Sequence, residues 1–228
     1  MRNSKAKRKQ QTVSAVKIII AFLIIVIVLF PIYLMFVSSV KPKSEVFDMQ
    51  LIPQTFTMDG YQKALDENLA QYFLNSLFVS ATVTLAALAF HAMAGYVLAR
   101  IPFSGRNGVF LGILSTMMIP FSVIMIPLFI MMKQFDWLNS YQGLILPAIP
   151  HAYGIFLFRQ FFVTLPKDLD EAATIDGCTK FGIFAKIMLP LSKSICITLA
   201  VAFFIANWNN YLWPLIVTQK NNMWVLQI

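Results

Sequence analysis

Long apolar runs separated by shorter polar stretches make up most of the chain. Five of these runs are drawn as membrane spans, at residues 18–40, 72–99, 108–132, 138–158 and 194–217. Each is long enough, because about 20 helical residues rising ~1.5 Å apiece cross the ~30 Å hydrocarbon core of a bilayer. The alternation of apolar and polar side chains that marks a membrane β-barrel is absent. The pattern therefore predicts an all-α membrane protein, a polytopic bundle of transmembrane helices.

The composition agrees with a membrane setting. Of the 228 residues, 58% are apolar and 12% are charged, whereas soluble domains carry about 25% charged residues. A soluble domain of this length could not bury so large an apolar fraction, so membrane lipid must be its solvent. The two cysteines, Cys178 and Cys196, are expected to be small apolar residues rather than a disulfide pair.

The placement of lysine and arginine predicts the orientation of the chain. If the helices alternate in direction, 13 of the 18 basic residues fall on one side, which the positive charge identifies as cytoplasmic. The regions that follow are a basic cytoplasmic tail (1–17), a first transmembrane helix (18–40), an extracytoplasmic segment (41–71) and a transmembrane domain (72–228). The first span is too long for the apolar region of a signal peptide, so we expect it to be retained. The net charge of +8 thus reports topology, and nucleic acid is not an expected partner.

The polar connection at residues 164–190 carries helical signals that a simple linker would not need. Pro166 suits the first position of a helix. The opening turns contain three carboxylates, Asp168, Asp170 and Glu171. Carboxylates there stabilise the positive end of the helix dipole, and Gly177 permits a sharp exit from the helix. We predict two short helices that meet at this glycine.

The second helix of this connection is predicted to present an apolar stripe. It starts after Thr179, a candidate N-cap, and runs to Leu189, where Pro190 ends it. The stripe consists of Phe181, Phe184, Ile187 and Met188. With the small side chains of Ala172 and Ala173 before the joint, the segment is predicted to be a docking surface for a cytoplasmic partner. A loop that lies on the lipid headgroups is the alternative.

The same segment resembles the EAA loop of binding-protein-dependent ABC importer permeases, in which Glu-Ala-Ala is followed by Asp-Gly and later by Leu-Pro. The residues that match are Glu171, Ala172, Ala173, Asp176, Gly177, Leu189 and Pro190. Cys178 and Ser194 stand where many members have alanine and proline. Residues 94–106 (AGYVLARIPFSGR) and 207–217 (NWNNYLWPLIV) resemble the corresponding regions of the maltose- and glycerol-phosphate-type carbohydrate permeases.

This resemblance implies the fold of a type-1 ABC importer permease and a role for the segment. In that family the loop inserts into a groove of a separate ATPase subunit, so Glu171 and Gly177 would be central to coupling, with Ala172 and Asp176 close behind. The resemblance also implies a second permease subunit, two ATPase subunits and an extracytoplasmic solute-binding protein as partners. Members of the family have a sixth helix, so we expect the domain at 72–228 to be incomplete.

The energy source is expected to lie outside this chain. The chain has no G-x-x-x-x-G-K-[ST] motif to hold ATP, and no enzyme activity, cofactor or metal is expected. The five spans contain no Asp, Glu, Lys or Arg, whereas an ion-coupled carrier typically keeps such a group in the membrane. His91 lies among small residues of a span, where an interhelical hydrogen bond is expected. A secondary carrier or a channel is the alternative from another class.

A path for the solute is predicted near the outer end of the last span. The candidate side chains are Asn207, Trp208, Asn210, Tyr211 and Trp213. Asn207 and Tyr211 are four residues apart and would share a helix face. Amides pair with sugar hydroxyls and aromatic rings pack on sugar C–H groups, which favours an uncharged sugar or polyol. An aromatic belt with amides joining helices is an equal alternative, and an amino-acid, phosphate or metal permease is the alternative within the family.

Overall fold

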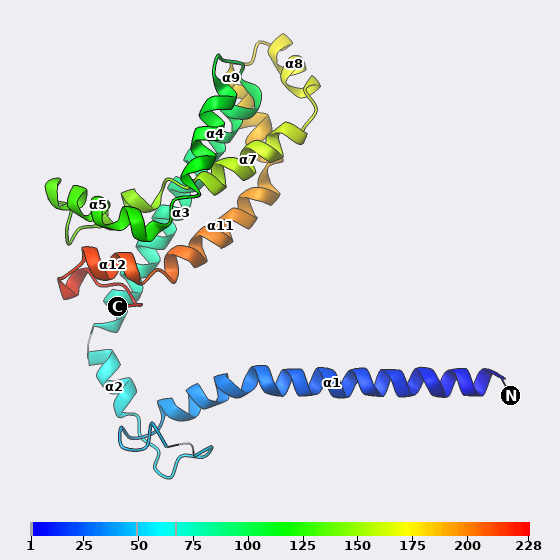
Figure 1. The fold of residues 1–228 in the computed structure, drawn as a ribbon, viewed down its shortest axis with the longest axis vertical. Coiled ribbons are helices and arrows are strands. Elements are labelled where there is room, and N and C mark those ends of the chain that lie inside the picture. Colours follow the sequence, from blue (N-terminus) through cyan, green and yellow to red (C-terminus); the bar gives the residue numbers. More distant parts are fainter. Residues whose placement is uncertain (1, 49, 67) are drawn as a thin grey trace. The chain divides into compact units, whose positions relative to one another are not determined.

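A computed structural model describes residues 2–48, 50–66 and 68–228 of the chain. Within these ranges the regular structure is helical and no strand is present (Figure 1). The all-α fold predicted from the apolar pattern is therefore confirmed. The chain divides into two units, Met1–Leu69 and Ala70–Ile228.

The first unit contains two helices joined by an irregular segment. Helix α1 comprises Arg2–Ser39 and helix α2 comprises Asp59–Asp66. The part of α1 at Val16–Ser39 has the length and the apolar composition of a membrane span, as predicted for residues 18–40. The helix also continues without a break through residues 2–17, where the sequence predicts only a basic tail.

One buried lysine organises the segment between these two helices. The ammonium group of Lys41 donates hydrogen bonds to the carbonyl oxygens of Asp48 and Gln50, at 2.9 and 2.8 Å. The N–H of Thr57 donates to the carbonyl oxygen of Val40 at 2.9 Å. A buried charge is tolerated only when its donors are satisfied, so these bonds hold the segment as a closed loop.

The second unit is built around one long helix. Helix α3 (Leu69–Arg100) has the length and composition of a membrane span, as predicted for residues 72–99. The other elements are α4 (Arg106–Thr116), α5 (Phe121–Gln134), α6 (Tyr141–Ile145), η1 (Leu146–Ala148), α7 (Ala152–Thr164), α8 (Asp168–Ile175), α9 (Lys180–Ile183), η2 (Phe184–Met188), α10 (Leu189–Leu191), α11 (Lys193–Trp208), α12 (Leu212–Val217) and η3 (Asn221–Met223). Figure 1 shows α8 and α9 at one end of this unit and α5 and α12 at the other.

The predicted third span, 108–132, is wrong as a single helix. Helix α4 ends at Thr116, helix α5 starts at Phe121, and the chain bends by 96° between them. Pro120 explains the break, because proline lacks the N–H that a helix interior needs and disfavours a helical conformation in the residue before it. Together the two helices still have the composition of one bent span.

The predicted spans 138–158 and 194–217 are also interrupted. The first is divided into α6, the 3-10 helix η1 and α7, with Pro147 and Pro150 at the interruption. The second is divided between α11 and α12. Helix α11 instead forms a pair, bent by 76°, with the helical segment from α9 to α10 that precedes it. Mean hydropathy does not detect such breaks, because a proline leaves an apolar run apolar.

The main core of the second unit lies where α3, α7 and α11 pack with the helical segment from α9 to α10. Phe158 and Phe162 of α7 are fully buried, as is Leu199 of α11. The ring of Tyr96 lies edge-on to Phe162, with centroids 6.0 Å apart, and is tilted against Phe184 at 5.3 Å. These aromatic contacts join three helices at the end of the unit where α8 and α9 lie.

The close approach of α3 and α7 depends on Gly95. A Cβ atom at this position would lie 2.6 Å from Cβ of Phe158 and 2.9 Å from the backbone nitrogen of Arg159. Both distances are shorter than van der Waals contact, so the two backbones can touch only because residue 95 has no side chain.

Replacing Gly95 with alanine should destabilise the unit, because the added methyl group overlaps α7. We expect a loss of about 1–3 kcal/mol in the free energy of unfolding of the purified protein in detergent, typical of overpacking. Gly112→Ala is the matched control, because this helical glycine has no atom within 4 Å of the added Cβ. It should be neutral or stabilising by up to about 1 kcal/mol. Equal losses in the two variants would contradict the close packing.

Candidate functional site

The 164–190 segment forms the short helices that the sequence predicts. Helix α8 carries acidic residues in its first turn, near the positive end of the helix dipole. The helix begins at Asp168, so Pro166 precedes it instead of occupying its first position. The predicted start of this helix was therefore two residues early.

A glycine in the left-handed conformation ends α8. The φ angle of Gly177 is 78°. Its N–H donates to the carbonyl oxygen of Thr174 at 3.1 Å, and the N–H of Cys178 donates to the carbonyl oxygen of Ala173 at 2.9 Å. These two bonds form a Schellman motif, which favours glycine because other residues are strained at positive φ. The predicted glycine joint is confirmed.

The helix after the joint continues further than predicted. Thr179 is its N-cap, as predicted, and its Oγ1 accepts a hydrogen bond from the N–H of Gly182 at 3.1 Å. The chain then passes through a π-helical turn, η2, and through Pro190 to Leu191. The prediction that Pro190 ends the helix was wrong. Its ring crowds the carbonyl of Lys186 and supplies no N–H, and the wider π turn before it accommodates both effects.

The apolar stripe of this helix is only partly buried. Phe184 and Met188 lie in the core and Ile187 is half-buried, as predicted. Phe181 is instead 70% exposed, and Ile183, which the stripe omits, is fully buried. The predicted stripe was therefore wrong at Phe181, whose side chain lines an apolar pocket of about 200 Å³ beside the end of α3.

Most of the residues that match the EAA pattern point outward. The exposed ones are Glu171, Ala172, Asp176, Gly177, Leu189 and Pro190. Ala173 is 4% exposed and packs into the main core. The two alanines, predicted to form one small-residue surface, thus lie in different surroundings, one exposed and one buried. One is open to a partner and the other attaches α8 to the bundle.

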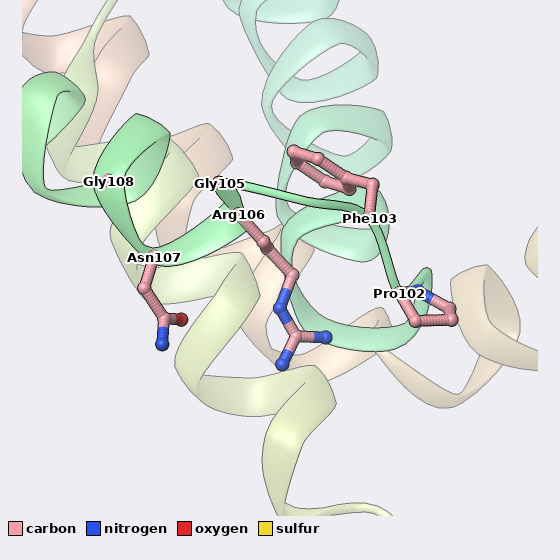
Figure 2. Close-up of a pocket in the computed structure, with 6 residues that line it drawn as sticks. All are labelled: Pro102, Phe103, Gly105, Arg106, Asn107 and Gly108. Carbon is pink, nitrogen blue, oxygen red and sulfur yellow. The ribbon is translucent and has the colours of Figure 1, made fainter.

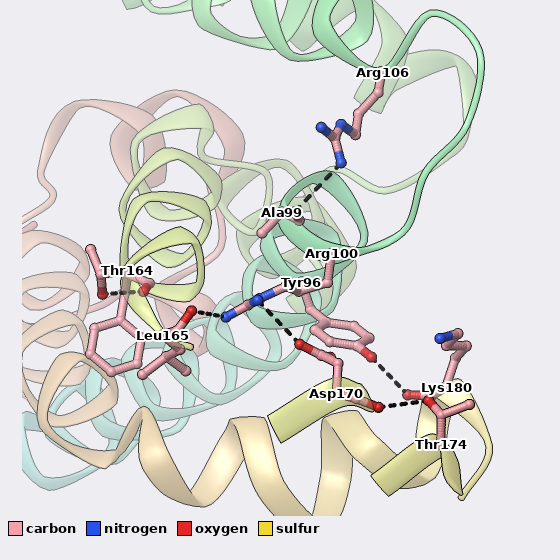
Figure 3. A network of polar contacts seen from close by, with 10 residues as sticks. Tyr96, Ala99, Arg100, Arg106, Thr164, Leu165, Asp170, Thr174 and Lys180 are labelled. Carbon is pink, nitrogen blue, oxygen red and sulfur yellow. Dashed lines mark hydrogen bonds and ion pairs between the residues drawn. The ribbon is translucent and has the colours of Figure 1, made fainter. Parts of the chain in front are cut away.

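Arg100 joins the segment to the last turn of α3 (Figure 3). Its Nη1 lies 3.1 Å from Oδ2 of Asp170, and its Nη2 donates to the carbonyl oxygen of Leu165 at 2.6 Å. The two side chains of the ion pair are 6% and 19% exposed, so solvent screens their attraction little. The hydroxyl of Tyr96 donates to the carbonyl oxygen of Lys180 at 3.1 Å. One helix end therefore holds the segment on both sides of its joint.

The turn between α3 and α4 carries a shallow pocket of about 300 Å³ (Figure 2). It is lined by Pro102, Phe103, Gly105, Arg106, Asn107 and Gly108. Gly105 has a φ angle of 80°, which makes the turn sharp. The lining comes from one turn with a single charged side chain, so it lacks the converging polar groups of a binding site.

Three of the predicted solute-path residues lie around one cavity. Asn207, Asn210 and Trp213 line a cavity of about 610 Å³. Its walls also include Thr116, from the break between α4 and α5, and His151, from the interruption before α7. Irregular backbone at membrane depth is tolerated where it lines a cavity or is buried in protein. The three helix breaks that hydropathy does not detect therefore meet at this cavity.

The other two solute-path candidates do not line this cavity. Helix α11 ends at Trp208, so the helix face that Asn207 and Tyr211 were predicted to share is not formed. Tyr211 is 49% exposed. The Trp208 ring stacks on Phe204 with centroids 5.6 Å apart, which makes it a packing residue of α11.

The hydrogen bonds of the lining residues show which polar atoms are occupied. Nε1 of Trp213 donates to the carbonyl oxygen of Gly143 at 3.0 Å, so this buried ring supports the wall. Nδ2 of Asn207 donates to the carbonyl oxygen of Phe203 at 2.8 Å. Oδ1 of Asn210 accepts from the N–H of Trp213 at 3.4 Å. The second amide atom of each asparagine makes no hydrogen bond to the described residues, which leaves an acceptor and a donor for a ligand.

His151 is a lining residue that the sequence analysis does not select. Its backbone N–H donates to Nε2 of His91 at 3.0 Å, and its ring stacks on Phe203 with centroids 5.7 Å apart. Because this bond joins the buried His91 of α3 to the residue before α7, the interhelical hydrogen bond predicted for His91 is confirmed. The position of His151 directly after Pro150, in an otherwise apolar run, was the available signal.

In the part of the chain that the structure describes, no group of three or more His, Cys, Asp or Glu side chains could hold a metal ion. Cys178 and Cys196 are free, half-buried thiols.

Known permeases match most of the chain. The family described as binding-protein-dependent transport system inner membrane component matches residues 91–227. The arabinooligosaccharides transport system permease protein AraQ of Halalkalibacterium halodurans is 39% identical, over 97% of this chain and 82% of that protein. The sn-glycerol-3-phosphate transport system permease protein UgpE of Escherichia coli strain K12 is 36% identical, over 85% of this chain and 72% of that protein.

A solved structure has the same fold. It is the crystal structure of a bacterial ABC transporter involved in the import of the acidic polysaccharide alginate. One of its chains matches with a TM-score of 0.83 at 24% identity, over 96% of this chain and 79% of that chain. At this identity the likeness concerns the arrangement of the helices.

Proposed function

Because this chain belongs to the family of binding-protein-dependent transport system inner membrane components, we propose that it forms half of the translocation pathway of an ABC importer for a sugar or related polyol. The observation that carries this proposal is the exposed glycine joint of the 164–190 segment, attached to α3 through Arg100. Through this joint the pathway is coupled to a separate ATPase subunit, and the permease itself performs no catalysis.

Coupling requires a surface that a partner can hold and a stiff path from that surface into the membrane. Glu171, Asp176 and Gly177 supply the exposed surface, and the small side chain of Ala172 allows a partner to approach the helix closely. Ala173 and Arg100 attach α8 to the bundle. On the other side of the joint, Leu189 and Pro190 lead into the bend before α11. Movement of the joint would thus displace both α3 and α11.

We place the 164–190 segment and the basic N-terminal tail (1–17) in the cytoplasm, and the 41–71 segment outside the cell membrane. The excess of lysine and arginine on the first side supports this orientation. Residues 72–228 then supply one half-pathway with one joint. A complete importer needs a second permease subunit, two ATPase subunits and an extracytoplasmic solute-binding protein that delivers the solute.

An uncharged sugar or polyol fits the cavity best. The residues that line it include no Asp, Glu, Lys or Arg. Its polar groups are amides, a hydroxyl and an imidazole, which exchange hydrogen bonds with hydroxyl groups without demanding charge. The named solutes of the relatives, arabinooligosaccharides and glycerol 3-phosphate, are both polyhydroxylated.

An anionic polyol is the second candidate. Two similar proteins are named for anionic solutes, glycerol 3-phosphate and alginate. A cation that balances such a solute would have to come from the second permease subunit, because this cavity has no lysine or arginine in its lining. No feature of this cavity specifically favours an amino acid, a metal ion or a coupling ion as the transported species.

The transport function is tested by uptake into vesicles that contain the permease with its partner subunits and binding protein. We expect uptake of a neutral saccharide or polyol only when ATP is present. Asn207→Ala should raise the KM for this solute about 2–10-fold, the value of one lost hydrogen bond, while leaving the maximal rate within about twofold.

Thr198→Ala is the matched control for Asn207. Thr198 lies on the same helix and also bonds to the carbonyl oxygen four residues earlier, but it lines no part of the cavity. Thr198→Ala should leave the KM for the solute unchanged. Uptake without ATP would make the chain a carrier of another class, and equal KM values for both variants would remove Asn207 from the solute path.

The coupling role is tested at Gly177. Valine at this position is strained by about 1–2 kcal/mol, because a β-branched residue disfavours positive φ. We expect Gly177→Val to lower ATP-driven uptake about tenfold and to weaken co-purification of the ATPase. Gly177→Asn should keep much of the activity, since asparagine tolerates the left-handed conformation.

Gly105→Val is the control for backbone strain in general. Gly105 has a φ angle of 80° and, like Gly177, no atom within 4 Å of an added Cβ. It lies outside the 164–190 segment, so its replacement should leave ATPase association intact. If the two valine variants lose association equally, the joint has no special role in docking.

A further inference from the structure

A cavity rich in basic side chains lies beside the 164–190 segment and outside the solute path. Its volume is about 560 Å³, within the range of small-molecule sites. The basic residues that line it are Arg100, Arg106, Arg159, Lys167 and Lys180. They come from α3, α4, α7, the residue before α8, and α9, so the chain brings five cations together from separate elements. Two carboxylates, of Asp170 and Glu171, also line the cavity.

The carboxylates do not balance these cations. Asp170 is already paired with Arg100 at 3.1 Å. Four cations are left to share Glu171, which is exposed. Like charges held this close repel one another, and the repulsion is relieved when an anion lies between them.

The polar contacts of the two other arginines leave donors for such an anion. Arg159 donates from Nε to the carbonyl oxygen of Leu98 at 3.3 Å, and its guanidinium lies 3.9 Å above the ring of Phe110. Arg106 donates from Nη1 to the carbonyl oxygen of Ala99 at 3.5 Å. Each guanidinium has five N–H donors, so most of the donors of both arginines make no bond to the described residues.

Arg100 itself has a polar atom that the described residues leave unsatisfied. Its Nε is buried and has no hydrogen-bond partner in the part of the chain that the structure describes. The side chain is 6% exposed and lines the cavity. A buried N–H without a partner is costly, and the buried Oδ2 of Asp170 beside it also makes no hydrogen bond to the described residues, so the ion pair alone does not satisfy this corner of the cavity.

We propose that this cavity binds the phosphate group of an anionic phospholipid. The apolar Ala99, Pro102 and Val163 also line it, so both a phosphate and the first carbons of a lipid have suitable surfaces. The cavity lies where the apolar helices α3 and α7 end, so with these helices in a bilayer it would lie near the lipid headgroups. Basic pockets between membrane helices on the cytoplasmic side bind such headgroups. The assignment to the cytoplasmic leaflet rests on the orientation proposed above.

The bound phosphate would hold the 164–190 segment against the helix bundle. It would neutralise cations from the α3–α4 turn, from α7 and from both helices beside the glycine joint at once. The lipid thus stabilises the position of the joint that Arg100 sets, and the stability of the segment depends on the anionic lipid content of the membrane.

The test compares two double variants of the permease in its complete complex, in nanodiscs of phosphatidylcholine with or without phosphatidylglycerol. Arg106→Gln with Lys167→Gln removes two cations of the cavity. Lys186→Gln with Lys193→Gln removes two exposed cations that do not line it. The readout is the number of phosphatidylglycerol molecules that stay bound after transfer to detergent, counted by native mass spectrometry. Inorganic phosphate added to phosphatidylcholine nanodiscs is a separate arm, read as a shift of the melting temperature.

We expect the first variant to retain fewer phosphatidylglycerol molecules than the unchanged protein, with loss of the lipid from this cavity, because each lysine or arginine near an anionic headgroup contributes roughly a factor of five to its binding. The second variant should bind it as the unchanged protein does. Equal losses in both variants, or none in either, would overturn the proposal. An equal stabilisation by inorganic phosphate would also overturn it. A loss of ATPase subunits with lipid binding unchanged would overturn it as well, because that result would assign the cavity to an acidic side chain of the partner. Transport is not measured, so a failure of this test can be told apart from a failure of the proposed transport function.

Discussion

The ion pair between Arg100 and Asp170 is the contact on which the position of the 164–190 segment depends. It joins the last turn of a long membrane helix to a short helix that otherwise packs on the bundle through Leu169 and Ala173. Because both side chains are largely buried, removing either would leave a charge without its partner, at a cost of about 3–5 kcal/mol. The second bond of Arg100, to the carbonyl oxygen of Leu165, fixes the chain just before α8. In the proposed coupling role, a partner that moves the glycine joint would therefore move α3.

The broken helices at the other end of the unit follow a different constraint. Prolines at 120, 147 and 150 interrupt runs that are apolar enough to span a membrane. Backbone groups freed in this way need a polar surrounding, and here they surround the cavity that Asn207 and His151 line. The second unit thus has a packed core between the end that holds the 164–190 segment and the end that holds this cavity. The bend before α11 and the continuous helix α3 connect these two ends.

Local signals in the sequence predicted the parts that depend on a few neighbouring residues. Gly177 and Thr179 act through bonds within four or five residues, so the joint and the N-cap could be read directly. The membrane-spanning part of α1 and most of α3 followed from apolar character alone, whereas the continuation of α1 through residues 2–17 did not. Arg100 could be recognised only as a charge that marks topology, because its partner Asp170 is brought near by folding. Prolines 120, 147 and 150 signal the breaks in two of the spans, but the break between α11 and α12 has no such signal, and hydropathy is insensitive to backbone direction. The pairing of His91 with His151 depends on the packing of α3 against α7.

The most direct measurement is a double-mutant cycle with Arg100→Gln and Asp170→Asn, in which uptake per ATP hydrolysed is measured for the complete importer. If the ion pair carries movement from the joint to α3, each single variant lowers this ratio and the double variant is no worse than the poorer single one. The interaction energy would then be about 1–3 kcal/mol. Effects of the two substitutions that simply add, or a ratio unchanged in all three variants, would contradict the account.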